Sequence, residues 1–183
     1  MELMELENLR HELLEDLCKE MNDAQVAAVV HKEEGAPEMV SAILDEVGDP
    51  ELEVRGDFYF RAPDSEDDAA QVFMSVITIS DELPEDRLPA LYEAISYVNF
   101  NIPVGSFSID KDHKFFCYVL SMLMPMELVE DAIFQEMDLA VGNALSIADS
   151  YIGILADVMN GKIDADGVVE FLGGPENGDP DDE

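Results

Sequence analysis

The sequence is poor in basic residues, and this shortage excludes several classes of function. It contains nine lysines and arginines against 43 aspartates and glutamates, which gives a formal net charge of −34 over 183 residues. The nine bases are scattered, and the closest pair is Lys111 and Lys114. Binding to a phosphate backbone requires clustered cations that displace counterions, so we expect no direct binding to nucleic acid. The same shortage argues against binding to an anionic membrane.

The sequence also lacks the features of an exported or membrane-spanning protein. No stretch approaches the roughly 20 uninterrupted apolar residues that cross a bilayer. The first five residues carry acids where a signal peptide has bases. Cys18 and Cys117 each lie in an apolar pattern, which predicts two buried free thiols in a reducing compartment rather than a disulfide. We therefore expect a cytoplasmic protein.

Motifs that carry catalysis or bind cofactors are missing too. There is no glycine-rich loop for phosphate and no Gly-x-Ser-x-Gly element, and the histidines show no metal-ligand spacing. Cys117 and His113 are a candidate nucleophile and base, but four residues apart they need not face each other, and a core role for the thiol is the favoured interpretation. Chance carboxylate pairs are inevitable among 43 acids, so they carry no information. We expect no enzyme activity, no cofactor and no metal site.

Two acidic segments are candidates for calcium, and each has a simpler interpretation. Residues 162–173 place Asp164 and Asp166 at positions 3 and 5 of an EF-hand loop. Lys162 and Gly173 then occupy the first and last positions, where acids are required, so an N-cap role for Asp164 or Asp166 in a short helix is the better interpretation. The run Asp64–Asp68 has no spaced ligand pattern and is expected to be a solvated loop.

What the sequence does contain is a pattern of α+β elements in one domain, residues 1–172, followed by an acidic tail, 173–183, that we expect to be disordered. Hydrophobic residues make up 48% of the chain, enough for a sizeable core. Periodicity predicts an antiparallel twisted sheet of about five to six strands flanked by helices, in the order α-β-β-β-β-α-β-β-α-α. Helices are expected at 3–21, 81–99, 127–159 and 166–172, and strands at 52–60, 70–80, 106–110 and 115–124.

Two details of this pattern stay open in the sequence. Residues 24–47 contain two apolar runs, 25–32 and 39–44, which fit either a hairpin or a helix because the first is rich in alanine. Gly56 interrupts the alternation of the strand 52–60 and is a candidate position for a β-bulge.

Three segments of the chain resemble the YbjN family, which is labelled as bacterial sensory transduction regulators. They are the strand Val72–Ile79 with the following helix that closes in Tyr97-Val98-Asn99-Phe100-Asn101, the run Val104–Asp110 before an aromatic strand, and Ala148-Asp149-Ser150-Tyr151 in the long helix. The resemblance is strongest over residues 70–157. It implies a bacterial protein with a fold like that of type III secretion chaperones, commonly dimeric. It implies no enzyme and transfers no catalytic residue.

One strand is anomalous because it is apolar on both faces. In the strand 115–124 every second residue forms the set Phe116, Tyr118, Leu120, Met122 and Met124, and the alternate positions are also largely apolar. An antiparallel sheet with helices on one side normally wets its other face. Something must then cover this sheet: the N-terminal hairpin and first helix, a second copy of the chain, or a partner. We predict these five residues as a partner or dimer surface, with a role in the core as the alternative.

Together these observations favour a non-enzymatic protein-binding or regulatory module, chaperone-like and homodimeric. The alternatives are an acidic protein that responds to Ca²⁺, and an unrecognised hydrolase built on scattered carboxylates.

The charge leads to a first prediction. Self-repulsion among 43 acids destabilises the compact state, and salt screens it. The melting temperature, followed by circular dichroism, should therefore rise between low salt and half-molar salt, and also on mild acidification. A melting temperature that does not move with salt would contradict the expectation.

Overall fold

The described part of the chain folds around one six-stranded antiparallel sheet with four helices, as the sequence pattern predicts. The computed structural model describes residues 3–48, 52–61, 70–112 and 114–173. The strands are ordered β1-β2-β3-β4-β6-β5 across the sheet, and every neighbouring pair is antiparallel. They are β1 (Ala27–Lys32), β2 (Glu38–Val47), β3 (Leu52–Arg61), β4 (Ala70–Ser80), β5 (Ser106–Asp110) and β6 (Phe115–Pro125).

The segment 24–47, left open between hairpin and helix, is a hairpin. Its two runs pair from Ala27 opposite Ile43 to Lys32 opposite Glu38, which makes β1 an edge strand. β-branched residues in both runs favour this pleated pairing. The expectation of a bulge at Gly56 is wrong, since the pairing of β3 runs unbroken through that residue.

Gly56 has a packing role instead. A Cβ at this position would lie 2.8 Å from the Phe58 ring and 3.1 Å from Leu44 Cδ1, so only glycine fits here without a shift. The register shifts of the sheet lie elsewhere, between Leu44 and Val47 in β2 and between Thr78 and Ser80 in β4.

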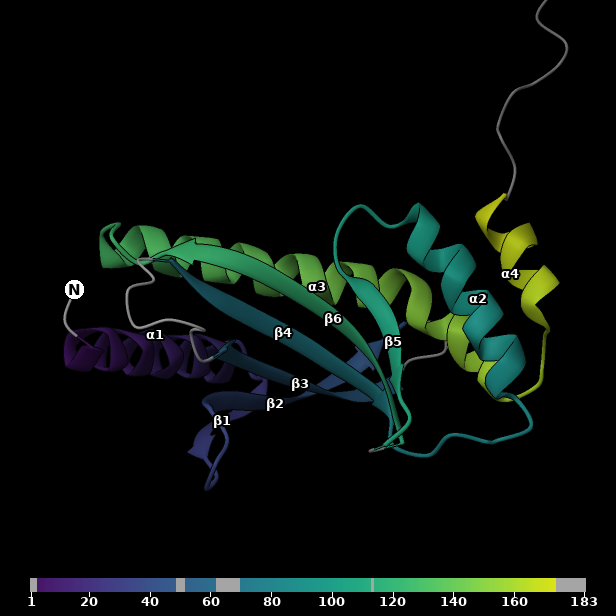
Figure 1. The fold of residues 1–183 in the computed structure, drawn as a ribbon, viewed down its shortest axis with the longest axis horizontal. Coiled ribbons are helices and arrows are strands. Elements are labelled where there is room, and N and C mark those ends of the chain that lie inside the picture. The colour runs from purple at the N-terminus through teal and green to yellow at the C-terminus, as the bar shows by residue number, and fades with distance from the viewer. Residues whose placement is uncertain (1–2, 49–51, 62–69, 113, 174–183) are drawn as a thin grey trace, which may run out of the picture.

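The two longest helices cover one face of the sheet. The helix α1 (Leu3–Asp23) packs against β1, β2 and β3, while α3 (Glu130–Met159) packs against β4 and β6 and touches α1. Figure 1 shows α3 passing along one side of the strands, with α1 at the end that carries the N-terminus. Leu13, Leu14 and Leu17 of α1 and Ile133, Met137 and Ala144 of α3 are fully or almost fully buried. We call the face that they cover the inner face.

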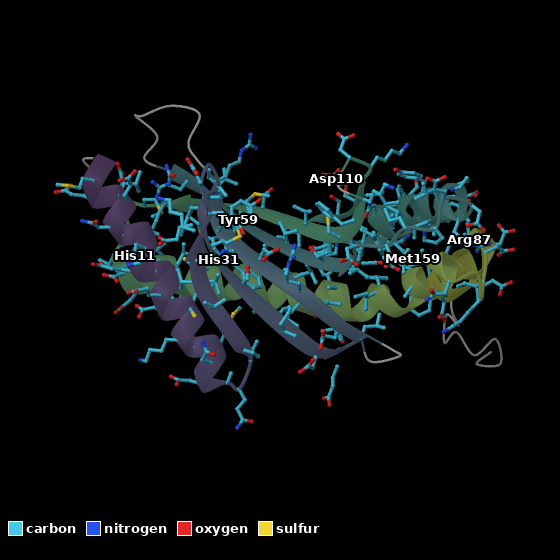
Figure 2. All side chains as sticks on the ribbon, turned by 90° about the horizontal axis from the view of Figure 1, so that it is seen from below. His11, His31, Tyr59, Arg87, Asp110 and Met159 are labelled. Carbon is cyan, nitrogen blue, oxygen red and sulfur yellow. The ribbon has the colours of Figure 1, made fainter. Side chains whose placement is uncertain are left out.

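The smaller helices close the opposite end of the molecule. The helix α2 (Leu88–Asn101) packs on α3, on β5 and on α4 (Ala165–Leu172). Arg87, just before α2, ties these helices together (Figure 2), because its guanidinium donates to the carbonyl oxygen of Val158 at 3.1 and 2.9 Å and to that of Ile163 at 2.9 Å. One of the nine basic side chains thus satisfies the carbonyl groups at the end of α3.

The helix α3 is long and apolar enough to cross a membrane by length and composition alone, but in the structure it serves as the central core helix. Eleven of its residues are buried. Amphipathic core helices of folded domains commonly pass the same test, so its composition alone does not identify a membrane span.

A histidine on α1 links that helix to the sheet and gives a second prediction. His11 Nδ1 lies 3.1 Å from Glu38 Oε2 on β2, and its Nε2 lies 3.4 Å from Glu15 Oε1. The hydrogen bond to Glu38, with the negative charge of that carboxylate, raises the pKa of His11 above 6.5. Because the folded pKa exceeds the unfolded one, the stabilisation is complete below the unfolded value and is lost as pH rises through the folded value.

We expect the pKa of His11, measured by NMR titration, to lie above 6.5 and to fall toward 6.5 in Glu38→Gln. The effect on stability should be small, since both partners are solvent-accessible. An identical titration curve in the variant would show that Glu38 does not hold the proton on His11.

Candidate interaction face on the open side of the sheet

The five side chains predicted as a partner surface lie on the inner face, so that prediction is corrected. Phe116, Tyr118, Leu120 and Met124 are buried and Met122 is partly buried, all within the hydrophobic core. The register explains the placement: Tyr118 stands opposite Ile77, and Leu120 opposite Ser75, on the side that α3 covers. The alternative interpretation, that these residues are core, holds in this chain.

Along the same strands, the residues that alternate with the inward ones form the outer side of the sheet. The described helices do not cover this side (Figure 1). The predicted cover by the N-terminal hairpin is ruled out, since β1 and β2 extend the sheet and α1 lies on the inner side. We call twenty of the outward positions that share one register the open face, and we leave out the pairs Ala70–Pro125 and Asp110–Phe115 at the ends of their strands. The twenty positions are Ala27, Val29, His31, Met39, Ser41, Ile43, Arg55, Asp57, Tyr59, Arg61, Val72, Met74, Val76, Thr78, Ser106, Ser108, Cys117, Val119, Ser121 and Leu123.

The open face is apolar at its centre. Met74 and Val76 of β4 stand beside Val119 of β6, and all three side chains are half-buried. Leu123 is 66% exposed at one end and Val29 is 57% exposed at the β1 edge. Large apolar side chains that share one exposed surface mark binding surfaces more often than scattered ones do.

The same face is almost free of acidic residues. Among its twenty positions the only carboxylate is Asp57, and two arginines, Arg55 and Arg61, give the face a net charge of +1 in a chain of net charge −34. Asp57 Oδ2 accepts a hydrogen bond from Arg55 Nε at 2.9 Å. Acids return in the next row of the sheet, at Glu53 and Asp110. Depletion of charge is characteristic of the centre of protein interfaces.

A shallow hollow of about 380 Å³ lies at the β1 end of the open face. Small side chains of β1 and β2 form its floor, with Val29, Ile43 and Arg55 around it and Asn22 at its boundary. The hollow can accept an apolar side chain of a partner, since Val29 and Ile43 are both exposed beside it.

Serine, histidine and aspartate also meet on this face, but not in a catalytic arrangement. Ser41 Oγ donates its single proton to Asp57 Oδ1 at 2.5 Å, and His31 Nε2 lies 2.8 Å from Ser41 Oγ. Since that hydroxyl proton is already donated, the ring nitrogen of His31 is the donor in its contact with Ser41. A hydrolytic triad requires histidine between serine and aspartate, accepting the serine proton. Here the serine lies between the other two, so the chain of hydrogen bonds fixes strands rather than activating a nucleophile. Figure 2 labels His31 on β1 and Tyr59 on β3 of this face.

Cys117 lies on the open face between Thr78 and Ser108 and is 3% exposed. Burial, followed by the nearby charge of Asp110, raises the pKa of its thiol to about 11, which keeps the sulfur protonated at neutral pH. A nucleophilic role needs the thiolate, so the thiol is unsuited to it. His113, the other member of the predicted pair, falls outside the described residues.

Only one of the two candidate calcium segments lies within the described residues. Asp164 is the N-cap of α4, and its carboxylate accepts a hydrogen bond from the backbone N–H of Gly167 at 3.2 Å, as the N-cap interpretation predicts. The loop Asp64–Asp68 and residues 174–183 of the tail lie outside the described part of the chain. Within that part, no group of three or more His, Cys, Asp or Glu side chains is placed to hold a metal ion.

At each edge of the sheet, an asparagine from the preceding helix bonds the backbone groups of one edge residue. At the β1 edge, Asn22 Nδ2 donates to the carbonyl oxygen of Ala28 at 2.9 Å, and Asn22 Oδ1 accepts from the Ala28 N–H at 3.3 Å. At the β5 edge, Asn99 makes the same pair of bonds to Phe107, at 3.0 and 2.8 Å. Each side-chain amide takes the place of a neighbouring strand's peptide group and occupies edge groups that another strand would use.

Sequence reasoning missed both the open face and the two edge asparagines. The face has a signal in the sequence, because β3 alternates charged or polar residues with Val54, Phe58 and Phe60, and the charged parity is the outer one. The asparagines share a weaker signal, an Asn in the last turns of a helix followed six or eight residues later by a strand.

No protein-family model, no curated protein and no solved structure matches this chain. The resemblance to the YbjN family therefore stays a prediction.

The edge asparagines give a third prediction. Asn99→Ala removes the hydrogen-bond partners of both the N–H and the carbonyl of Phe107, a residue whose side chain is buried. The free energy of unfolding should therefore fall by about 1–3 kcal/mol. Asn101→Ala is the matched control, since the Asn101 side chain bonds only the Tyr97 carbonyl on an exposed helix surface, and its effect should stay within about 0.5 kcal/mol. Urea denaturation of both variants measures the difference, and equal losses would count against the edge role.

Proposed function

We propose that this protein is a non-enzymatic protein-binding module that contacts its partner through the open face of the sheet. The observation that carries the proposal is the asymmetry of the sheet: its inner face lies under α1 and α3, whereas its apolar outer face has no helix over it in the described chain. Antiparallel sheets that face water alternate apolar and polar residues, and β4 does not do so.

The composition of the open face supports a protein partner. It carries methionine, tyrosine and arginine, which are enriched at protein interfaces, and lysine, glutamate and aspartate, which are depleted there, are almost missing from its twenty positions. Flexible methionine side chains such as Met39 and Met74 adapt to an opposing surface.

The arrangement of polar groups favours binding over catalysis. The serine, histidine and aspartate of the face bond one another in an order that leaves no base for the serine. The thiol of Cys117 is held protonated by burial. We therefore propose recognition as the role of this surface, with no reaction assigned to it.

Site-specific photo-crosslinking tests the proposal and gives a fourth prediction. A photoreactive phenylalanine analogue placed at Met74, on the open face, should form adducts with protein in cells that express the chain, because a bound partner lies against that position. The same analogue at Leu139, exposed on α3 away from the sheet, serves as the control and should form none above background. Equal labelling from both positions, or no protein adduct from position 74, would overturn the proposal.

A further inference from the structure

We infer that the occupant of the open face is a second copy of this chain, docked sheet against sheet. The inference rests on the proposed function and names its partner. Three features of the described chain support it: the occupied edge residues, the charge distribution and the size of the face.

The occupied edge residues count against the simplest alternative, growth of the sheet by strand addition. A strand that paired with β1 would compete with Asn22 for the Ala28 peptide groups, and one that paired with β5 would compete with Asn99 at Phe107. Edge strands usually rely on charge, proline or bulges for such protection. Because each edge is already occupied at one residue by the chain's own side chain, strand addition is disfavoured, and the open face is the larger surface of the sheet for contact.

The charge distribution selects the partner. Two copies carry −34 each, so contact through most surfaces brings like charges together. Contact through the open face brings two surfaces of net charge +1 together, each with Asp57 already paired to Arg55. A strongly basic partner would find no unpaired carboxylate among the twenty positions to meet its cations. The open face of a second copy is itself apolar and close to neutral, so it matches the open face of the first copy.

The size of the face is also sufficient. Each of the twenty positions covers roughly 32 Å², from a strand spacing of about 4.8 Å and a repeat of about 6.7 Å between outward residues. The flat area is therefore roughly 640 Å² per copy, or about 1,300 Å² for two copies, which lies at the lower end of the ~1,200–2,000 Å² that specific interfaces bury. Two such sheets would pack about 10 Å apart.

The test is the mass of the protein in solution, measured by light scattering after size exclusion, and it provides a fifth prediction. The wild-type chain in half-molar salt should have twice the 20.3 kDa chain mass. Leu123→Glu places a carboxylate on the open face and should raise the dimer dissociation constant by on the order of tenfold or more, since like charges then meet in the contact. Leu139→Glu, the same change on α3, should leave it unaltered.

A second matched pair of variants distinguishes loss of the contact from misfolding of the chain. Val76→Glu lies at the centre of the face and Val169→Glu on the exposed side of α4, and thermal unfolding of each variant checks its fold. Asn22→Ala and Asn99→Ala should retain the dimer, because the edges take no part in it.

Two results would overturn the inference: a wild-type chain that stays monomeric at every salt and protein concentration, or a dimer that survives both face variants. A monomer whose position 74 still crosslinks to other proteins would remove the second copy as partner while leaving the proposed function in place. A monomer whose position 74 forms no protein adduct would overturn both the inference and the proposed function.

Discussion

The packing of α1 and α3 on a single face of the sheet is the interaction on which the rest of the structure depends. Their leucines, isoleucine and methionine meet the inner side chains of β2, β3, β4 and β6 in one continuous core that includes Phe58, Phe73 and Tyr118. With both long helices on this side, and with α2 and α4 packed at the end of the molecule, no described helix covers the other side. The open face is therefore a consequence of where the helices find their core, and its apolar character is what distinguishes it from an ordinary wet sheet surface.

The order of elements could be predicted from the sequence because each signal is local. Alternation, prolines and glycines mark the strands and the helices within a few residues, and the largest difference is the start of α2, which begins at Leu88 rather than near residue 81. The orientation of β6 could not be predicted in the same way. Both of its parities are apolar, so the choice between Tyr118 and Cys117 as the inward residue depends on partners outside the strand.

The inward residues of β6 are determined by two strand pairings between segments that are distant in the sequence. The charged residues of β3 lie on the outer side of the sheet. β3 pairs with β4, and β4 pairs with β6, which follows it in the sequence only after a helix and a strand. Asp57, Val76 and Val119 therefore share one row. The edge asparagines are non-local in another sense. Asn22 and Asn99 each need a particular angle between a helix and the strand after it, and asparagine side chains form such local backbone contacts in many settings, so residue type alone does not identify them.

The strong negative charge and the apolar face act together on association. At physiological ionic strength the Debye length is about 8 Å, while the row containing Val76 and Val119 lies two rows, or roughly 13 Å, from the row of Glu53 and Asp110. The centre of the face is then largely screened from those carboxylates, whereas the rest of the surface still repels at short range. At about 0.01 M salt the Debye length grows to about 30 Å, and the repulsion reaches across the whole face. In the proposed docking of two copies, this distribution protects the chain from unspecific contact by its own charge, and the attraction between the apolar centres is expressed only where and when that charge is screened.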